Sequence, residues 1–438
     1  MSDLLAARSQ MAISLAFHIV FASIGIGLPL LMILAEVAWL RTGAPLYRRL
    51  NDAWARGLAL FFAVGAVSGT VLSFELGLLW PTFMEYAGPL IGMPFSLEGL
   101  AFFAEAIFLG IYLYGWGRVS PRIHLASGVV VALSGAASGL FVLSVNGWMN
   151  APVGFEAGPD GPLGIDPVAA MANPFWIANA VHALLAAYVA TGFGAATLHA
   201  WRLLRRPGDR FHQAGLRLAV GLGAVAALLQ PISGDFSARV VGEQQPIKLA
   251  AMEAHFETRA CAPLLLGGLP DAETRTTRWA LAVPCGLSLL HGHSPDAVVQ
   301  GLEDFPEELW PPLLPVRLGF QIMIGVGVFL AGLGLVALWR LARRRALDAR
   351  PLLFLFVAAG PLAFLAIQAG WVVTEVGRQP WVIYGVMKTA DAVTPMPGLV
   401  VPFVAFTLLY VLLSVVLVLV MGRITRTEER RAQVESGS

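Results

Sequence analysis

Nine long runs of apolar residues alternate with short polar connections along the chain. About 20 consecutive apolar residues are enough to cross the hydrocarbon core of a membrane as a helix. The predicted membrane helices lie near residues 12–40, 57–80, 97–117, 124–147, 175–201, 213–233, 316–339, 352–374 and 400–421. The pattern predicts an all-α integral membrane protein with about nine transmembrane helices and its two termini on opposite sides of the membrane.

One connection is much longer than the others. Residues 234–315 are polar and rich in Glu, Pro and Gly, and a loop of this length between helices is usually functional or disordered. The predicted organisation is therefore 1–233 with the first six helices, 234–315 as an outer loop, and 316–438 with the last three helices and a polar tail.

Arginine clusters in alternate connections, while the second and fourth connections contain no Lys or Arg. Positively charged loops stay on the cytoplasmic side. The distribution places the N-terminus and the long loop outside and the C-terminus in the cytoplasm. The residues concerned are Arg41, Arg48, Arg49, Arg56, Arg118, Arg122, Arg202, Arg205, Arg206, Arg210, Arg340, Arg343, Arg344, Arg345, Arg350, Arg423, Arg426, Arg430 and Arg431.

Composition supports this class and excludes others. The chain is 57% hydrophobic and 13% charged, against about 25% charge in soluble domains. No basic patch with interleaved aromatic residues occurs, which argues against nucleic-acid binding. Cys261 and Cys285 do not form a CxxC motif. They are compatible with a disulfide or with two free thiols.

Two of the eight histidines fall inside predicted membrane helices, His18 in the first and His182 in the fifth. Both lie about a third of the way in from the outer face. An ionisable residue at this depth is costly and therefore indicates function, so two at one depth predict a shared cofactor rather than packing. The others, expected at solvated helix ends or in the loop, are His124, His199, His212, His255, His291 and His293.

Carboxylates occur at similar depth. Glu98 and Glu105 are seven residues apart, close to two helical turns, so they share one face roughly 10 Å apart. That spacing predicts a proton relay, with a pair of structural acids as the alternative. Glu375 ends the eighth helix, and Arg378 at i+3 is its expected ion-pair partner.

Met323 lies near the outer start of the seventh helix. A lone methionine usually serves packing, but histidine with methionine is also an axial pair for low-spin haem. The spacing leaves open whether Met323 meets His182. Because transporter sites usually lie near the midplane, polar groups near the outer face favour a redox site.

Six blocks of sequence carry a resemblance to a known family. They are Glu98-Gly-Leu-Ala-Phe-Phe-Ala-Glu105, Gly115-Trp, Val145-Asn-Gly-Trp-Met149, Asn173-Pro, Lys248-Leu-Ala-Ala-Met-Glu253 and Gly370-Trp-Val-Val-Thr-Glu-Val-Gly-Arg-Gln-Pro-Trp381. In this order they make the chain resemble subunit I of the cytochrome bd quinol oxidases over nearly its whole length.

The resemblance implies three haems and assigns their ligands. His182 and Met323 would bind a low-spin haem b, while His18 and Glu375 would bind two high-spin haems, a haem b and usually a haem d. Which of these two irons each residue binds stays open. Further implied roles are quinol binding for Lys248 and Glu253, the proton route for Glu98 and Glu105, and haem surroundings for Asn146, Trp371 and Arg378.

The implied activity is quinol oxidation at the outer face coupled to reduction of O₂ to water, which generates a proton motive force without a pump. The implied partners are a second membrane subunit, a small single-helix subunit, membrane quinol and O₂, in a prokaryotic plasma membrane. Ubiquinol and menaquinol both remain open.

Two features depart from the common family pattern. The outer loop is short, as in the branch that includes cyanide-insensitive oxidases, whose members can hold haem b in place of haem d. In addition, Gln321 stands where the family often has Arg, two residues before Met323.

Other classes fit less well. A proton-coupled transporter could use Glu98 and Glu105 without any haem. Cytochrome b of the bc complexes would need two histidines on one face of each of two helices, and a haem–copper oxidase would need adjacent histidines; the sequence has neither pattern.

Overall fold

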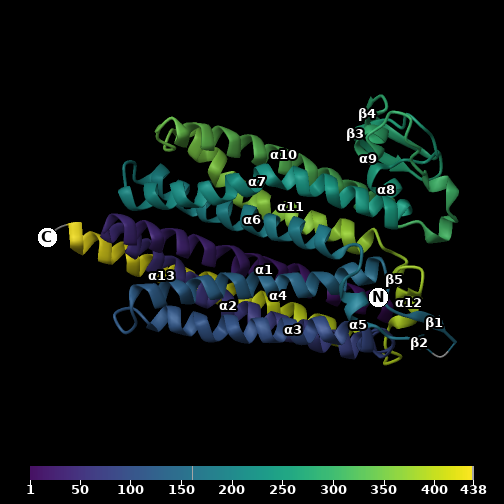
Figure 1. Cartoon of the computed structure of the whole chain (residues 1–438), viewed down its shortest axis with the longest axis horizontal. Helices are drawn as coiled ribbons and strands as arrows, with labels where there is room; N and C mark the ends of the chain where they lie inside the picture. Colours follow the sequence, from purple (N-terminus) through teal and green to yellow (C-terminus); the bar gives the residue numbers. More distant parts are fainter. Residues whose placement is uncertain (160, 437–438) are drawn as a thin grey trace. The chain divides into compact units, whose positions relative to one another are not determined.

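The computed structural model describes the backbone of residues 1–159 and 161–436 and, within them, side chains up to residue 423 (Figure 1). In this part of the chain, nine helices are long and apolar enough to cross a membrane. They are α1 (Asp3–Thr42), α2 (Pro45–Leu79), α3 (Pro81–Tyr114), α4 (Pro121–Asn150), α6 (Trp176–Arg205), α7 (Arg210–Gln244), α10 (Leu313–Ala342), α11 (Arg350–Val376) and α13 (Val400–Ser436). The predicted all-α membrane fold is confirmed.

Short elements connect these helices. The helical ones are α5 (Pro167–Met171), α8 (Pro246–Glu253), α9 (Gly286–Gly292) and α12 (Thr389–Ala392), with 3₁₀ turns η1 (Leu302–Asp304) and η2 (Glu307–Leu309). Three antiparallel hairpins pair β1 (Glu156–Gly158) with β2 (Gly161–Leu163), β3 (Leu264–Asp271) with β4 (Thr276–Val283), and β5 (Trp381–Ile383) with β6 (Met387–Lys388).

Several helices extend beyond their apolar runs. α3 begins at Pro81 rather than near residue 97, and α7 continues to Gln244 rather than ending near residue 233. A helix satisfies its own backbone groups, so leaving the apolar run does not end it. In the added part of α7, Arg239 and Asp235 form an i,i+4 ion pair at 2.8 Å, a spacing that supports helix. The polar connection is therefore shorter than 234–315.

The contacts within the chain define two compact units. One comprises residues 1–81, 103–135 and 393–438, and the other comprises 82–102 and 136–392. In the first unit α1 packs against α2 and α13. The carboxylate of Asp3 accepts a hydrogen bond from the Leu399 backbone N–H at 2.8 Å. The first and last membrane helices therefore begin at the same end of this unit and run parallel.

The second unit is built on four neighbouring helices, α6, α7, α10 and α11 (Figure 1). Their shared core is apolar and includes Phe193, Leu330 and Phe356. Small residues allow the backbones to approach: a Cβ on Gly192 would lie 2.5 Å from the backbone of Gly223. Such close contact is characteristic of packed membrane helices.

One end of these four helices carries α8, α9 and the β3–β4 hairpin (Figure 1). A disulfide joins Cys261 to Cys285 across this hairpin. The structure thus selects the disulfide over the free thiols that the sequence left open.

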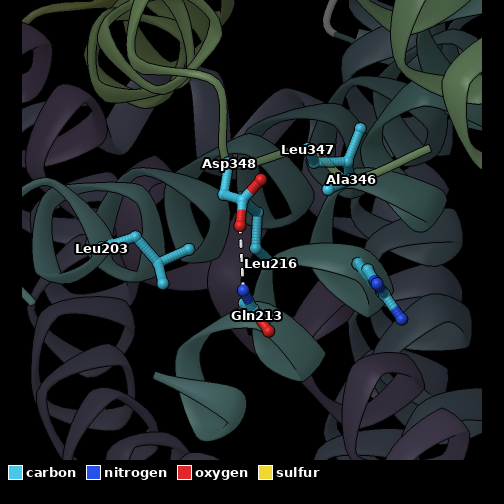
Figure 2. A pocket seen from close by; sticks show the side chains of 7 residues that line it. Leu203, Gln213, Leu216, Ala346, Leu347 and Asp348 are labelled. Atoms are coloured by element: carbon cyan, nitrogen blue, oxygen red, sulfur yellow. Dashed lines mark hydrogen bonds between the residues drawn. The ribbon is translucent and has the colours of Figure 1, made fainter. Parts of the chain in front are cut away.

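The connection between α10 and α11 folds back onto the start of α7 (Figure 2). Gln213 donates a hydrogen bond to Asp348 at 2.9 Å, beside a small hollow lined by Leu203, Leu216 and Leu347. None of the expected site residues lines this hollow.

Candidate functional site

The two intramembrane histidines are held in the same way. His18 Nδ1 lies 2.9 Å from Ser68 Oγ on the neighbouring helix α2. His182 Nδ1 lies 3.0 Å from Ser233 Oγ on the neighbouring helix α7. The two sites belong to different units of the chain, and each orients its imidazole with a serine hydroxyl.

The serine hydroxyls also fix the tautomer of each imidazole. Ser68 donates its proton to the carbonyl of Gly65 at 3.1 Å, and Ser233 donates to the carbonyl of Gln230 at 2.9 Å. A hydroxyl has one proton, so each must accept from Nδ1–H of its histidine. Nε2 is left unprotonated, which is the state that ligates a metal.

A glycine follows each serine and lies against the imidazole. A Cβ on Gly69 would lie 3.1 Å from Cε1 of His18, and a Cβ on Gly234 would lie 3.4 Å from Cε1 of His182. The sequence pair Ser-Gly thus supplies both the hydrogen-bond partner and the room for the ring.

Met323 lies in the same four-helix unit as His182. It projects from α10 toward α11, where a Cβ on Gly370 would be 3.0 Å from its sulfur. The Gln230 amide lies 3.1 Å from His182 Nε2 and donates to it. Iron at Nε2 would therefore displace this amide.

Both carboxylate oxygens of Glu375 are held by donors. Asn146 donates to Oε1 at 2.5 Å and Arg378 donates to Oε2 at 2.6 Å. The predicted Glu375–Arg378 ion pair is confirmed, and Trp371 lies one turn earlier on the same helix.

Arg378 has hydrogen-bonding capacity that the described residues do not use. Its side chain is buried, and its Nε and Nη1 have no acceptor among the described residues. A buried unpaired cationic donor is costly, so the site fits a ligand with negatively charged oxygens. The carboxylate groups of a haem meet this requirement.

Lys248 projects from α8 into the unit. Its side chain is 2% exposed, and its ammonium donates to Asn150 Oδ1 at 2.5 Å and to the Thr374 carbonyl at 3.3 Å. Burial holds the pKa of Lys248 well below its usual value, and the neighbouring Arg378 lowers it further.

Glu253, at the end of α8, pairs with Arg317 of α10 at 3.4 Å. Burial raises the pKa of Glu253 to about 7, although Arg317 opposes the shift. Arg317 is 1% exposed and also donates to the carbonyls of Met252, Leu265 and Gly267. It therefore fastens α8 and β3 to α10.

Arg317 was not among the site residues predicted from the sequence. The available signal was its position as the one basic residue of the apolar run 316–339. Its neighbour Gln321 donates to the same Gly267 carbonyl at 2.6 Å. Position 321 therefore faces β3.

The two acids expected in a proton relay lie in different units. Glu98 accepts a hydrogen bond from Ser138 at 2.9 Å. Glu105 is buried, and a Cβ on Gly135 would lie 3.4 Å from its carboxylate. Each is thus placed against α4, and a relay between them stays a prediction.

A further buried acid, Glu75, was missed by the sequence analysis. It is 1% exposed and accepts hydrogen bonds from Gln10 at 3.0 Å and Ser14 at 2.8 Å. Ser14 and Gln10 lie one and two turns before His18 on α1. The sequence could have indicated Glu75, because it is an acidic residue within the apolar run 57–80.

The expectation that histidines at helix ends are solvated was wrong for two of the three. His124 is 1% exposed and bonds Glu36 at 2.8 Å, while His199 is buried and lies 3.0 Å from His212. The helices continue past the apolar runs, so neighbouring helices cover positions that the sequence placed at the membrane surface. Glu36, an acid within the predicted run 12–40, is also buried and was not predicted as a site residue.

A hollow of about 340 Å³ lies between the end of α7, α8 and α9. Its wall is partly polar and partly apolar, and consists of Gly242, Pro246, Leu249, His291, Val298, Val299 and Gln300. Pockets that hold small organic ligands usually have a volume of about 300–1,000 Å³.

No group of three or more His, Cys, Asp or Glu side chains gathers within the described part of the chain. A metal at His18 or His182 would need most of its ligands from a cofactor. Each site offers one histidine with an unprotonated Nε2, which is the contribution expected of the protein when a cofactor supplies the other ligands.

Comparison with known proteins covers nearly the whole chain. Residues 6–429 match the family model described as cytochrome bd terminal oxidase subunit I. The chain is 36% identical to a putative cytochrome bd menaquinol oxidase subunit I of Bacillus subtilis, over 96% of each chain. It is 29% identical to a cytochrome bd-II ubiquinol oxidase subunit 1 of Escherichia coli, over 88% of each chain. The solved bd oxidase of Geobacillus thermodenitrificans superposes with a TM-score of 0.92 at 39% identity, covering 97% of this chain and 99% of the other.

Proposed function

Because the chain belongs to the cytochrome bd terminal oxidase subunit I family of respiratory quinol oxidases, we propose that it is the haem- and quinol-binding subunit of such an oxidase. It is a multi-pass protein of the prokaryotic plasma membrane. As a subunit I, the chain has a second membrane subunit as its partner. We also propose a small single-helix subunit as a further partner.

The haem proposal rests on the shared geometry at His18 and His182. Each histidine presents an unprotonated Nε2 because a serine accepts from its Nδ1. His182 and Met323 are proposed as the axial ligands of a low-spin haem b, and His18 and Glu375 as ligands of the high-spin haem b and of haem d or a second high-spin haem b. Bound haem would supply one-electron transfer and the oxygen-reducing centre.

The quinol proposal rests on α8 and the hollow beside it. Glu253, with a pKa of about 7, is suited to accept a proton from a quinol hydroxyl near neutral pH. Lys248 lies on the same helix, and the hollow along Pro246 and Leu249 has the volume for a quinone ring, with the polar side chains of His291 and Gln300 in its wall. The arginine pattern favours the outer side for this loop.

The proton proposal uses the buried acids. Quinol protons would leave at the loop side, while Glu98 and Glu105 would pass protons from the cytoplasm toward the oxygen-reducing centre. Release on one side and uptake on the other generate a proton motive force without a pump.

The test is to purify the chain with its partner subunit and measure quinol-dependent oxygen consumption together with the visible spectrum. The proposal expects both turnover and reduced haem bands. A folded complex without a haem band would overturn it and would favour the proton-coupled transporter.

A further inference from the structure

We propose that Lys248, besides its role at the quinol loop, helps to position the expected haem ligand Glu375. It would do so by orienting two hydrogen-bonded asparagines, Asn150 and Asn146, that hold the Glu375 carboxylate. This inference rests on the proposed function, since it concerns how the expected haem ligand Glu375 is positioned.

The chain consists of three consecutive hydrogen bonds within one unit. Lys248 donates to Asn150 Oδ1 at 2.5 Å. The amide nitrogen of Asn150 donates to Asn146, at 3.3 Å to Oδ1 and at 2.8 Å to the backbone carbonyl. The amide nitrogen of Asn146 donates to Glu375 Oε1 at 2.5 Å.

The direction of this chain follows from its oxygen acceptors. The backbone carbonyl of Asn146 can only accept, so it takes a proton from the Asn150 amide nitrogen, and the Glu375 carboxylate oxygen accepts from Asn146. Asn150 must therefore turn its oxygen toward Lys248 and its nitrogen toward Asn146. Asn146 must then accept on its oxygen and present its nitrogen to Glu375. The amide dipoles are aligned, and aligned hydrogen bonds strengthen one another.

Removing the donor at position 248 removes part of this constraint. Asn150 Oδ1 would then keep only the amide of Gln245 at 3.2 Å. The Asn150 side chain would be held less firmly, and so would Asn146, whose Oδ1 it contacts at 3.3 Å. The Asn146 bond to Glu375 would weaken, and the carboxylate would depend more on Arg378 at 2.6 Å.

The direction of Lys248 supports this role. Its side chain is buried and reaches Asn150 on α4 and the Thr374 carbonyl on α11. A Cβ on Gly377, two residues beyond Glu375, would lie 3.2 Å from Lys248 Cγ. The hollow beside α8 is lined instead by its neighbours Pro246 and Leu249. Lys248 therefore contacts the helix that carries Glu375.

Gln245 is a second donor to Asn150. Its amide lies 3.2 Å from Asn150 Oδ1 and also donates to the Asn150 carbonyl. It can partly hold Asn150 when Lys248 is replaced, so the expected effect of Asn150→Leu, which breaks the chain, exceeds that of Lys248→Met.

The test compares these two variants with Glu253→Gln in the complete oxidase complex. Glu253 also lies on α8, but it pairs with Arg317 and not with the asparagine chain. Haem content, the high-spin bands and their midpoint potentials are measured after reduction with dithionite, which bypasses quinol. Quinol oxidation is measured separately.

Lys248→Met and Asn150→Leu are expected to shift a high-spin potential and to weaken retention of that haem by up to roughly 10-fold. This is the lower end of the effect of losing a direct partner of a metal ligand, because both residues act on Glu375 through Asn146. Lys248→Arg, which keeps a donor, should retain most of the haem. Glu253→Gln should slow quinol oxidation with unchanged high-spin bands.

The low-spin band shows that each variant is folded. If Lys248→Met and Asn150→Leu lose only quinol oxidation and keep the wild-type high-spin bands and potentials, the inference is wrong and the proposed function stands. If the unmodified complex contains no haem, the proposed function itself fails. These two failures are therefore distinguishable.

Discussion

The surroundings of His18 and His182 differ although both histidines use the same Ser-Gly pair on the next helix. His18 has the buried acid Glu75 two turns along α2 from its serine, bonded to Gln10 and Ser14 of α1. Beside its serine, His182 contacts the neutral amide of Gln230 at 3.1 Å, and Met323 lies on α10 of the same unit.

This difference separates two kinds of redox chemistry. If haem is bound there, a neutral amide and a thioether would suit a site that exchanges electrons without protons. Carboxylates buried in the unit of His18, Glu75 and Glu105 among them, can carry the protons that oxygen reduction consumes. Under the proposed function, each histidine with its serine would hold the iron, and the groups around it would determine whether protons accompany the electrons.

The largest expected effect is at His182. His182→Ala should abolish the low-spin band while the high-spin bands at the other site persist, because the two histidines belong to separate units. The reduced-minus-oxidised spectrum of the purified complex measures this. A surviving low-spin band would disprove the ligand assignment.

Glu105→Ala tests the proton side of the comparison. A buried carboxylate can relay a proton and alanine cannot, so turnover should fall by roughly 10²-fold or more, with haem reduction by quinol unchanged. Steady-state oxygen consumption and stopped-flow haem reduction give the two values. Unchanged oxygen consumption would rule out an essential relay at this position.

Ser68→Ala and Ser233→Ala test the shared part of the two sites. Each removes the acceptor for Nδ1–H of its histidine, so each should weaken its own haem about 10–100-fold and spare the other. Haem retention after washing in detergent measures the loss, and Ser→Thr at each position is the matched control. Equal loss of all haems from both variants would contradict the assignment of His18 and His182 to separate haem sites.

Glu253 gives a pH-dependent test in the quinol loop. Its pKa is raised to about 7 by burial, so it is mostly protonated, and unable to accept a proton, below that pH. The rate of quinol oxidation should fall roughly tenfold per pH unit below about 7. Glu253→Gln should be slower and lack this dependence. An unchanged pH profile in Glu253→Gln would exclude the role.

The same shift has a consequence for stability. Because the folded-state pKa of Glu253 is raised, the folded protein takes up the proton more readily than the unfolded chain. The stability linked to this group is present at low pH and is lost as pH rises through about 7.

The smallest expected effect is at Gln321. A cation near a haem raises its potential, but Gln321 faces β3, where it bonds the Gly267 carbonyl at 2.6 Å, and Arg317 already lies there. Gln321→Arg should shift the low-spin potential by less than about 60 mV, a tenfold change for one electron. A larger rise in a redox titration would show that position 321 reaches the haem.

Much of the fold could be predicted from the sequence. The nine spans are long and apolar enough to identify, and the block around Glu375 and Arg378 correctly indicated their ion pair. Helix ends could not be placed, because backbone hydrogen bonds continue α7 through Asp235 and Arg239 into polar sequence.

The partners of the site residues were less predictable. Ser68 and Ser233 are ordinary residues in sequence, and only the pairing of α1 with α2 and α6 with α7 gives them a role. Asn150 and Lys248 are 98 residues apart, so their contact depends on the folded chain. Glu75 and Glu36 were visible as acids within apolar runs and could have been identified from the sequence.

Pyridine haemochrome analysis of the purified complex, combined with a scan of the red region of the reduced spectrum, measures directly whether haem is bound. We expect bound haem, with low-spin and high-spin bands in the same preparation and a red band if haem d is present. A folded complex of this chain and its partner subunit with no haem would contradict this expectation.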